Sequence, residues 1–177
     1  MKIENIKVGY LETNVYILSK NGHSLIIDPG DEADVIIKKV DGIVDGIVVT
    51  HHHFDHIGAL EEVKNYYKTK VYDINNLKEG NTSIGEFKFK VIYTPGHTDD
   101  LISLYFNDIN SLFCGDFIFK DGIGRFDFPE SNFKDMQKSI SKILTIPKNT
   151  HIYPGHGDKT TLGDEYMNLK HYLTYKF

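Results

Sequence analysis

Residues 48–60 read VVTHHHFDHIGAL, so that four histidines and an aspartate follow a short apolar run. The chain holds only nine histidines in 177 residues, and nearly half of them lie in this one segment. An expression tag does not explain the cluster, because the run is internal and is interrupted by Phe54 and Asp55. The segment therefore needs a chemical explanation.

The spacing within this segment suits metal coordination. Side chains of an extended segment alternate between two faces, so His51 and His53 point the same way and can converge on one ion. His52 points elsewhere and is expected to be a neighbour of the site, not a ligand. Asp55 and His56 lie past the bend, where they can reach a second ion.

Three later strands are also followed by a residue of a type that binds metals. His97 lies in TPGHT, Asp116 in CGD and His156 in YPGHG. A glycine beside each of them lets the backbone bend sharply or approach closely. Loops that a rigid sheet holds at its strand ends are common places for functional sites.

Together these four loops supply the predicted metal ligands: His51, His53, Asp55, His56, His97, Asp116 and His156. Imidazole nitrogens and carboxylate oxygens suit zinc, iron or manganese. Seven ligands are too many for one tetrahedral ion. They fit two ions with three terminal ligands each, bridged by Asp116 and a solvent oxygen. We expect two divalent metal ions, with zinc first and iron or manganese as alternatives.

The remaining pattern predicts a mixed α and β protein. Asn21-Gly22 is a favoured type I′ hairpin turn between two apolar segments. Strands are expected at residues 3–8, 15–18, 24–27, 46–49, 87–93, 102–106, 111–114 and 151–153. Helices are expected at residues 31–40, from about 58 to 67, at 133–144 with a cap at Ser131 or Asn132, and from about 164 onward.

Composition excludes several classes of protein. A chain of 177 residues without a long linker or an internal repeat is expected to form one domain, 1–177. Its net charge of −5 does not suggest nucleic acid or an anionic membrane as a partner. No signal peptide or long apolar span is recognisable, and Cys114 is the single cysteine. We therefore expect a cytoplasmic protein that acts on a small molecule.

These motifs resemble a known family. THHHFDH matches the T-H-x-H-x-D-H signature of the metallo-β-lactamase fold superfamily, and TPGHT, GD and PGHG match its later ligand motifs in order. YLETNVYIL followed by IIDPG is similar to its opening strands. GDFIFKDGIGRFDFPESN and PGHGDKTTLGDE look most like glyoxalase II (hydroxyacylglutathione hydrolase) and its short single-domain relatives.

The resemblance implies a fold and an assignment of the ligands. The fold is an αβ/βα four-layer sandwich of the α+β class, with two mixed sheets face to face and helices outside. His51, His53 and His97 would hold the first metal, whereas Asp55, His56 and His156 would hold the second, with Asp116 as the bridge. Arg125 matches a basic residue that lies near the substrate's carboxylate in glyoxalase II. Alternatively, Arg125 is a structural residue that pairs with Asp127.

The expected activity is hydrolysis of a thioester of the hydroxyacyl-thiol type by a hydroxide that bridges the metals, with Asp55 and Asp116 as catalytic residues. Bound metal lowers the pKa of water from about 15.7 to about 7. A thiolate, whose thiol has a pKa of about 8.5, leaves without a general acid, whereas an amide needs a proton donor that is not evident in the sequence. Cys114 is expected to pack in a strand.

Other activities of the superfamily stay open. Only 21 residues follow His156, too few for the helical domain that contributes glutathione contacts in glyoxalase II, so those contacts are not carried over. The alternatives are a persulfide dioxygenase with one Fe(II) and a lactonase or β-lactamase on the same fold. A nuclease would carry a nucleic-acid-binding insertion, and a non-catalytic relative would have lost ligands.

Overall fold

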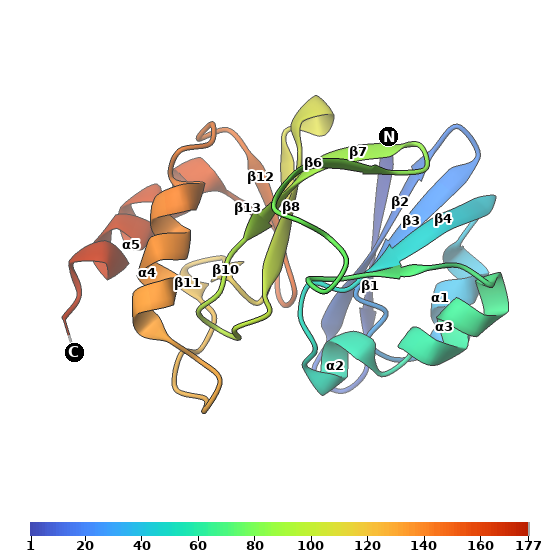
Figure 1. Ribbon diagram of the computed structural model, residues 1–177, viewed down its shortest axis with the longest axis horizontal. Helices are drawn as coiled ribbons and strands as arrows, with labels where there is room; N and C mark the ends of the chain where they lie inside the picture. The colour runs from blue at the N-terminus through green and yellow to red at the C-terminus, as the bar shows by residue number, and fades with distance from the viewer. Residues whose placement is uncertain (177) are drawn as a thin grey trace.

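Two mixed β-sheets pack face to face, and helices cover their outer faces, in the computed structural model (Figure 1). The structure describes residues 1–176. Helices α1 and α3 lie outside the first sheet, whereas α4 and α5 lie outside the second. This is the αβ/βα sandwich of the α+β class that the sequence predicts.

The first sheet has five strands. Their spatial order is β1 (Lys2–Val8), β2 (Thr13–Lys20), β3 (His23–Ile27), β4 (Ile43–Val48) and β5 (Val71–Tyr72). The first three are antiparallel neighbours, whereas β3, β4 and β5 run parallel. Parallel neighbours need a crossover connection. The helices in these crossovers are α1 (Ala33–Lys39), α2 (Phe54–Ile57) and α3 (Leu60–Tyr67).

The second sheet has six strands. Their spatial order is β13 (Thr160–Thr161), β12 (His151–Pro154), β9 (Ser111–Gly115), β8 (Ile102–Phe106), β7 (Phe87–Tyr93) and β6 (Gly80–Ile84). Only the β9–β12 pair is parallel. The remaining elements are the 3₁₀ turn η1 (Asn107–Ile109), the small hairpin of β10 (Ile118–Phe119) and β11 (Gly122–Ile123), and the helices α4 (Phe133–Ile143) and α5 (Leu162–Thr174).

Strand β2 shows how the layers hold together. Tyr16 and Leu18 belong to the apolar cluster between the sheets, whereas Val15 and Ile17 belong to the cluster beneath α1 and α3. A strand that is covered on both faces has a continuous apolar sequence, here VYIL. Truncation of a fully buried aliphatic side chain of this kind to alanine costs about 2–5 kcal/mol.

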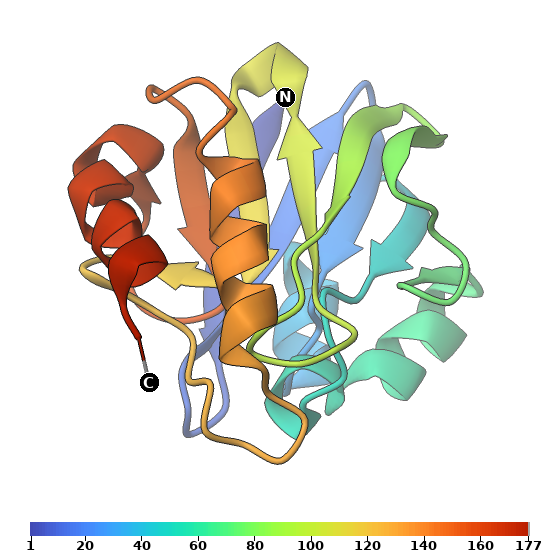
Figure 2. The ribbon, with the colours of Figure 1, turned by 60° about the vertical axis from the view of Figure 1, so that its left-hand side comes forward.

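Helix α4 closes the other side of the sandwich (Figure 2). The side chain of Asn132 accepts a hydrogen bond from the backbone nitrogen of Asp135, so Asn132 is the cap and Ser131 is not. Met136, Ile140 and Ile143 fall on one face at helical spacing and are fully buried against the second sheet.

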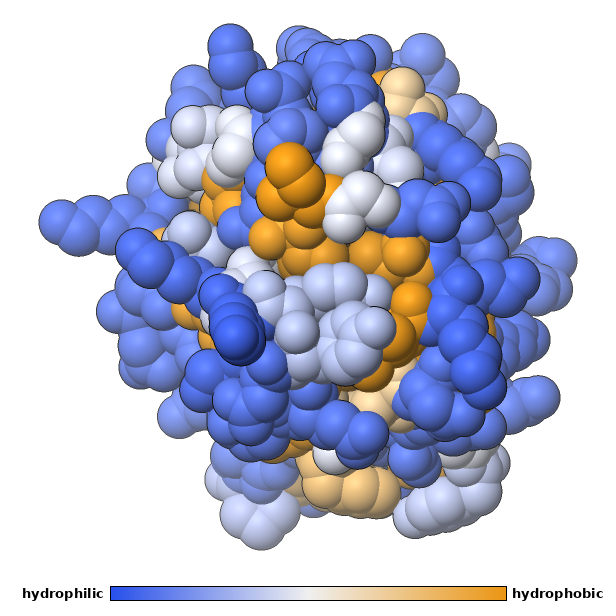
Figure 3. Space-filling view, turned by 90° about the vertical axis from the view of Figure 1, so that its right-hand side faces the viewer, coloured by the Kyte–Doolittle hydropathy of each residue, from blue (hydrophilic) through white to orange (hydrophobic). Residues whose placement is uncertain are grey.

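The opposite face of the molecule, which carries α1 and α3, has a band of apolar side chains bordered by hydrophilic ones (Figure 3). Ile43 on β4 and Tyr66 on α3 are exposed large apolar side chains, each at 63%. Among the described residues, no helix is both long and apolar enough to cross a membrane.

The structure confirms every strand and helix expected from the sequence, with ends shifted by a few residues. In the Asn21-Gly22 turn both residues have positive φ, as a type I′ turn requires. Five short strands were not expected from the sequence, namely β5, β6, β10, β11 and β13. The helix expected from about residue 58 is preceded by a separate short helix, α2, because the turn into the helical region starts within the histidine segment.

Candidate metal centre

The topology places four strand ends at one edge of the sandwich. Strand β8 is antiparallel to both β7 and β9, and β12 is parallel to β9, so β7, β9 and β12 all run in the same direction. The loops after β7 and β4, the β1–β2 loop and the segment after β11 lie together at the lower edge in Figure 2. All seven predicted metal ligands lie on this edge.

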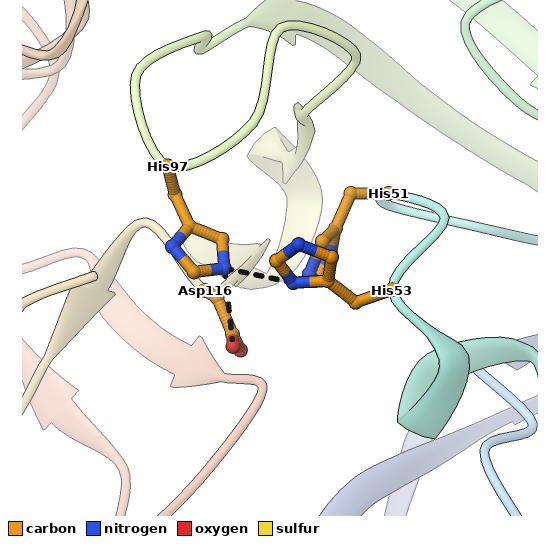
Figure 4. Close-up of side chains that lie close together, drawn as sticks. All are labelled: His51, His53, His97 and Asp116. Carbon is orange, nitrogen blue, oxygen red and sulfur yellow. Dashed lines mark hydrogen bonds and ion pairs between the residues drawn. The ribbon is translucent and has the colours of Figure 1, made fainter. Parts of the chain in front are cut away.

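The first ligand group is His51, His53, His97 and Asp116. One nitrogen or oxygen atom of each lies within 4.8 Å of the corresponding atoms of the others. The Nε2 atom of His97 lies 3.1 Å from Nδ1 of His53 and 3.6 Å from Oδ2 of Asp116 (Figure 4). His51 is completely buried beside them. Four potential ligands from three loops thus converge on one point.

The second ligand group is Asp55, His56 and His156, also within 4.8 Å of one another. Nε2 of His156 lies 3.1 Å from Oδ2 of Asp55. Asp116 stands between the two groups, because its Oδ1 atom lies 3.3 Å from Nε2 of His56 and its Oδ2 atom lies 3.5 Å from Nε2 of His156. Its carboxylate can therefore serve both groups.

Three buried atoms in this cluster make no hydrogen bond of regular geometry, namely His51 Nε2, His56 Nε2 and Asp116 Oδ1, although the last two lie 3.3 Å apart as an ion pair. A buried polar atom without a partner costs about 1–3 kcal/mol, so such atoms are rare in folded proteins. All three are of the types that bind divalent transition metals, and they face the two groups described above. The residues therefore fit metal ions.

Asp28 orients both buried histidines of the segment. Its carboxylate accepts hydrogen bonds from the backbone nitrogen and the hydroxyl of Thr50, both at 2.7 Å. Its Oδ2 atom also lies 3.0 Å from Nδ1 of His56, and the Thr50 hydroxyl lies 3.1 Å from Nδ1 of His51. Each imidazole is thus bound at its remote nitrogen, which leaves Nε2 for the cluster. Asp28 can be grouped with His51 and His56, but its oxygens are already occupied.

The sequence reasoning did not identify Asp28. In the sequence it stands only in IIDPG, which is similar to the opening strands of the resembled family. A signal was present, because a carboxylate follows directly after the fully buried apolar run of β3. Such a buried charge needs partners.

Backbone carbonyls orient two further histidines. Nδ1 of His97 lies 2.8 Å from the carbonyl oxygen of Arg125, and Nδ1 of His156 lies 3.0 Å from that of Leu11. Because a carbonyl only accepts, each Nδ1 carries the hydrogen and each Nε2 faces the cluster. The Thr13 hydroxyl donates to Oδ2 of Asp55 at 2.9 Å.

Burial and charge set the protonation of the second group. Burial on its own lowers the pKa of His56, but the carboxylates of Asp116 and Asp28 outweigh it and raise that pKa to about 10. Burial also acts downward on His156, whereas Asp116 and Asp55 raise its pKa to about 9. Burial raises the pKa of Asp55, but His156 and His56 bring it down to about 2.

In the first group, by contrast, the pKa values of two histidines are lowered. Burial lowers the pKa of His51 well below its usual value, and the nearby His56 adds to this effect. Burial also lowers the pKa of His97. Both imidazoles are therefore neutral at pH 7, which is the form that binds a metal.

The residues expected outside the ligand set are also placed. His52 points away from the cluster and pairs with Asp73 and Asp100, as its spacing predicts. Cys114 is fully buried in β9, and burial raises the pKa of its thiol to about 12. Arg125 pairs with Asp127 and also lines the cavity above the cluster.

That cavity has a volume of about 510 Å³ and opens over both groups. Its polar lining consists of ligand residues and Arg125. The fold and this histidine–aspartate cluster define a metal-binding protein of the α+β class.

The chain belongs to the metallo-beta-lactamase superfamily, whose family model matches residues 8–79 and 72–156. It is 33% identical to "Probable metallo-hydrolase YqgX" of Bacillus subtilis, over 90% of this chain and 92% of that protein. It is 36% identical to a hydroxyacylglutathione hydrolase of Psychromonas ingrahamii, over 78% of this chain but only 58% of that protein. It is 27% identical to hydroxyacylglutathione hydrolase GloC of Haemophilus influenzae, over 93% and 95%.

Two solved structures show the same fold. BLEG-1, a B3 metallo-beta-lactamase, superposes with a TM-score of 0.91 at 31% identity, over 98% of this chain and all of that one. TTHA1623 in a di-iron-bound form superposes with a TM-score of 0.82 at 28% identity, over 92% and 96%.

Proposed function

We propose that the protein is a hydrolase of small acyl thioesters that uses two divalent metal ions, zinc in the first place, held by the seven residues of the cluster. The observation that carries this proposal is the position of Asp116 between the two ligand groups, within 3.6 Å of histidines from both. A carboxylate in this position is suited to bridge two ions.

Bound divalent ions would activate water as the nucleophile and polarise the carbonyl of the substrate. Other residues of the chain hold the candidate ligands in place for this chemistry. Asp28, Thr50 and the carbonyl of Arg125 are hydrogen-bonded to Nδ1 of His56, His51 and His97, respectively. The Nε2 atoms of these histidines therefore need little movement to bind a metal. Asp55 is held by the Thr13 hydroxyl and by His156.

The lining of the cavity favours a thioester over an amide or a peptide. Apart from the ligand residues and Arg125, the described residues that line it are Leu11, Phe54, Phe119 and Phe128. None of these four can donate a proton to a leaving amine. A thiolate leaves without such help, because the pKa of a thiol is about 8.5. Two relatives named hydroxyacylglutathione hydrolase agree with this substrate class.

The test is to load the purified protein with zinc, iron or manganese and to measure hydrolysis of a panel of acyl thioesters. We expect turnover by the metal-loaded protein and loss of at least a hundredfold in kcat/KM for Asp116→Ala. A protein that holds two ions per chain and cleaves no thioester would refute the assignment.

Hydrolysis of a β-lactam is the second candidate, favoured by the likeness to BLEG-1. A chromogenic cephalosporin assayed beside the thioesters distinguishes the two. Ring strain assists the departure of the β-lactam amine, so this reaction depends less on a proton donor than hydrolysis of an ordinary amide does.

A further inference from the structure

The cavity above the cluster has an apolar wall. Leu11, Phe54, Phe119 and Phe128 stand around the ligand residues. Leu11 and Phe54 are 42% and 64% exposed. A single exposed apolar side chain needs no explanation, but two exposed and two half-buried ones around one cavity mark a binding surface. This wall suits a ligand with apolar groups.

A narrower crevice of about 190 Å³ adjoins the cavity. The two spaces share Leu11, Phe54 and Asp55, so they lie on either side of the ridge that Leu11 and Phe54 form. Val8 and Tyr10 extend the apolar wall of the crevice. A ligand seated over the cluster can therefore extend across the ridge and keep apolar contacts.

Three carboxylates outside the candidate ligand set, Asp31, Glu32 and Glu130, lie in or beside the two spaces. Asp31 lines the crevice, and Glu32 accepts a hydrogen bond from the backbone nitrogen of Gly9 at its edge. Glu130 lies on the opposite side, next to His53. A ligand carboxylate placed beside these three groups, away from the metal ions, would meet a like charge, which disfavours its binding.

Arg125 is the one lysine or arginine among the described residues that line either space, and it is already paired. Its Nε and Nη2 atoms each donate to the carboxylate of Asp127 at 2.9 Å. Its guanidinium carbon lies 4.4 Å from the centre of the Phe128 ring. A ligand carboxylate would have to compete with Asp127 for this arginine.

We propose that the site takes thioesters whose acyl and thiol parts are apolar and carry no carboxylate, so that glutathione is not the preferred thiol. This inference rests on the proposed thioesterase function and narrows its substrate class. Asp127 acts as a specificity-determining residue, because it pairs with Arg125, which would otherwise attract a carboxylate of the ligand.

The experiment uses the metal-loaded full chain and matched pairs of thioesters. One pair has the same acyl group on glutathione and on N-acetylcysteamine, which is neutral. The other pair has a lactoyl or a phenylpropionyl group on N-acetylcysteamine. We expect kcat/KM to be at least tenfold higher for the phenylpropionyl group, since burial of each methylene changes an equilibrium constant about fourfold. We also expect it to be higher for the neutral thiol, because the carboxylates of glutathione would meet Asp31, Glu32 and Glu130 without a free cation.

Non-cleavable thioether analogues of the same four compounds give a second measurement that needs no turnover. Their dissociation constants, measured by calorimetry on the metal-loaded protein, are expected to follow the same order. This measurement shows which ligands the site prefers, whether or not the protein hydrolyses them.

Variants test whether Leu11 and Asp127 cause the expected substrate preference. Leu11→Ala keeps the carbonyl that holds His156 and is expected to lower the phenylpropionyl preference at least threefold. Met167→Ala removes an apolar side chain that is 74% exposed on α5 and lines neither space, and it is the matched control. Asp127→Asn is expected to raise the ratio of kcat/KM for the glutathione ester over the neutral ester about two- to fivefold, since an exposed ion pair contributes a factor of this size.

The outcomes are distinct. Equal or better turnover and binding of the glutathione compounds would overturn the inference and leave the thioesterase function standing. Thioethers that bind in the expected order, without hydrolysis of any thioester, would refute the function and support the ligand class. Failure of both turnover and the binding order would refute both.

Discussion

The Nε2 atom of His53 lies 3.0 Å from the Oε1 atom of Glu130, a carboxylate on the loop between β11 and α4. The same loop contributes the carbonyl of Arg125 to His97, and its Phe128 ring makes T-shaped contacts with both histidines. One loop thus holds two ligands of the first group from outside. A carboxylate on the remote nitrogen fixes the orientation of a ligand histidine and makes it a stronger base.

Glu130→Gln is therefore expected to weaken binding of the ion in the first group by about 10–100-fold, the usual effect of such a partner. Competition with a fluorescent chelator measures this affinity directly. Glu62→Gln, an exposed site on α3 far from the cluster, is the matched control. An unchanged affinity in Glu130→Gln would show that the ring of His53 is held by packing alone.

Asp28→Asn is expected to destabilise the fold as well as the second group. Asp28 is 2% exposed and receives hydrogen bonds from Thr50 and His56. An asparagine has one acceptor oxygen where three donors meet, and a lost bond to a buried charged group costs about 2–3 kcal/mol. Urea unfolding of the metal-free protein measures the loss, and metal analysis is expected to show fewer than two ions per chain.

Asp108→Asn changes an exposed aspartate in η1 and controls for the loss of one charge. If both variants unfolded at the same urea concentration as the parent, Asp28 would have no structural role.

The seven candidate ligands stand out in the sequence, but the contacts that Glu130 and Asp28 make with them do not. Each candidate follows a strand, either in the histidine-rich THHHFDH or next to a glycine in TPGHT, CGD and YPGHG, and both patterns are visible without coordinates. Glu130 reaches His53 across 77 residues and Asp28 reaches His56 across 28, and no local pattern records such contacts. The unexpected strands β5 and β10 have two residues each, too few to show an alternating pattern.

Gly155 is expected to tolerate no side chain. A Cβ atom at this position would lie 2.1 Å from Oδ1 of Asp116 and 2.7 Å from Cε1 of His56. Gly155→Ala must therefore push Asp116 away from its place between the two groups. Metal analysis is expected to show loss of at least one ion, with at least a hundredfold lower kcat/KM on whichever substrate the parent protein cleaves.

Gly122→Ala is the matched control for this substitution, because a Cβ atom there has no neighbour within 4 Å. It is expected to keep the metal content and the activity of the parent. Full metal content in Gly155→Ala would mean that the cluster can rearrange, contrary to the close packing described above.

The raised pKa values in the second group predict how metal-free protein responds to pH. His56 and His156 have folded-state pKa values of about 10 and about 9, above the value of about 6.5 for a histidine in an unfolded chain. Their contribution to stability is therefore complete below about pH 6.5 and is lost as the pH rises through 9 to 10. Urea midpoints of the metal-free protein are expected to fall over that alkaline range.

The same two protons have to leave when a metal binds. A metal binds the unprotonated imidazole, so at pH 7 His56 and His156 must each release a proton. Calorimetric titration with zinc in two buffers of different ionisation enthalpy counts these protons, and we expect about two. Affinity is expected to rise about tenfold per pH unit for each proton released, up to pH 9.

His156→Gln should reduce the number of protons released by one, whereas His171→Gln, an exposed site on α5, should leave it unchanged. A heat of binding that does not depend on the buffer would mean that the carboxylates do not hold these imidazoles in their charged form.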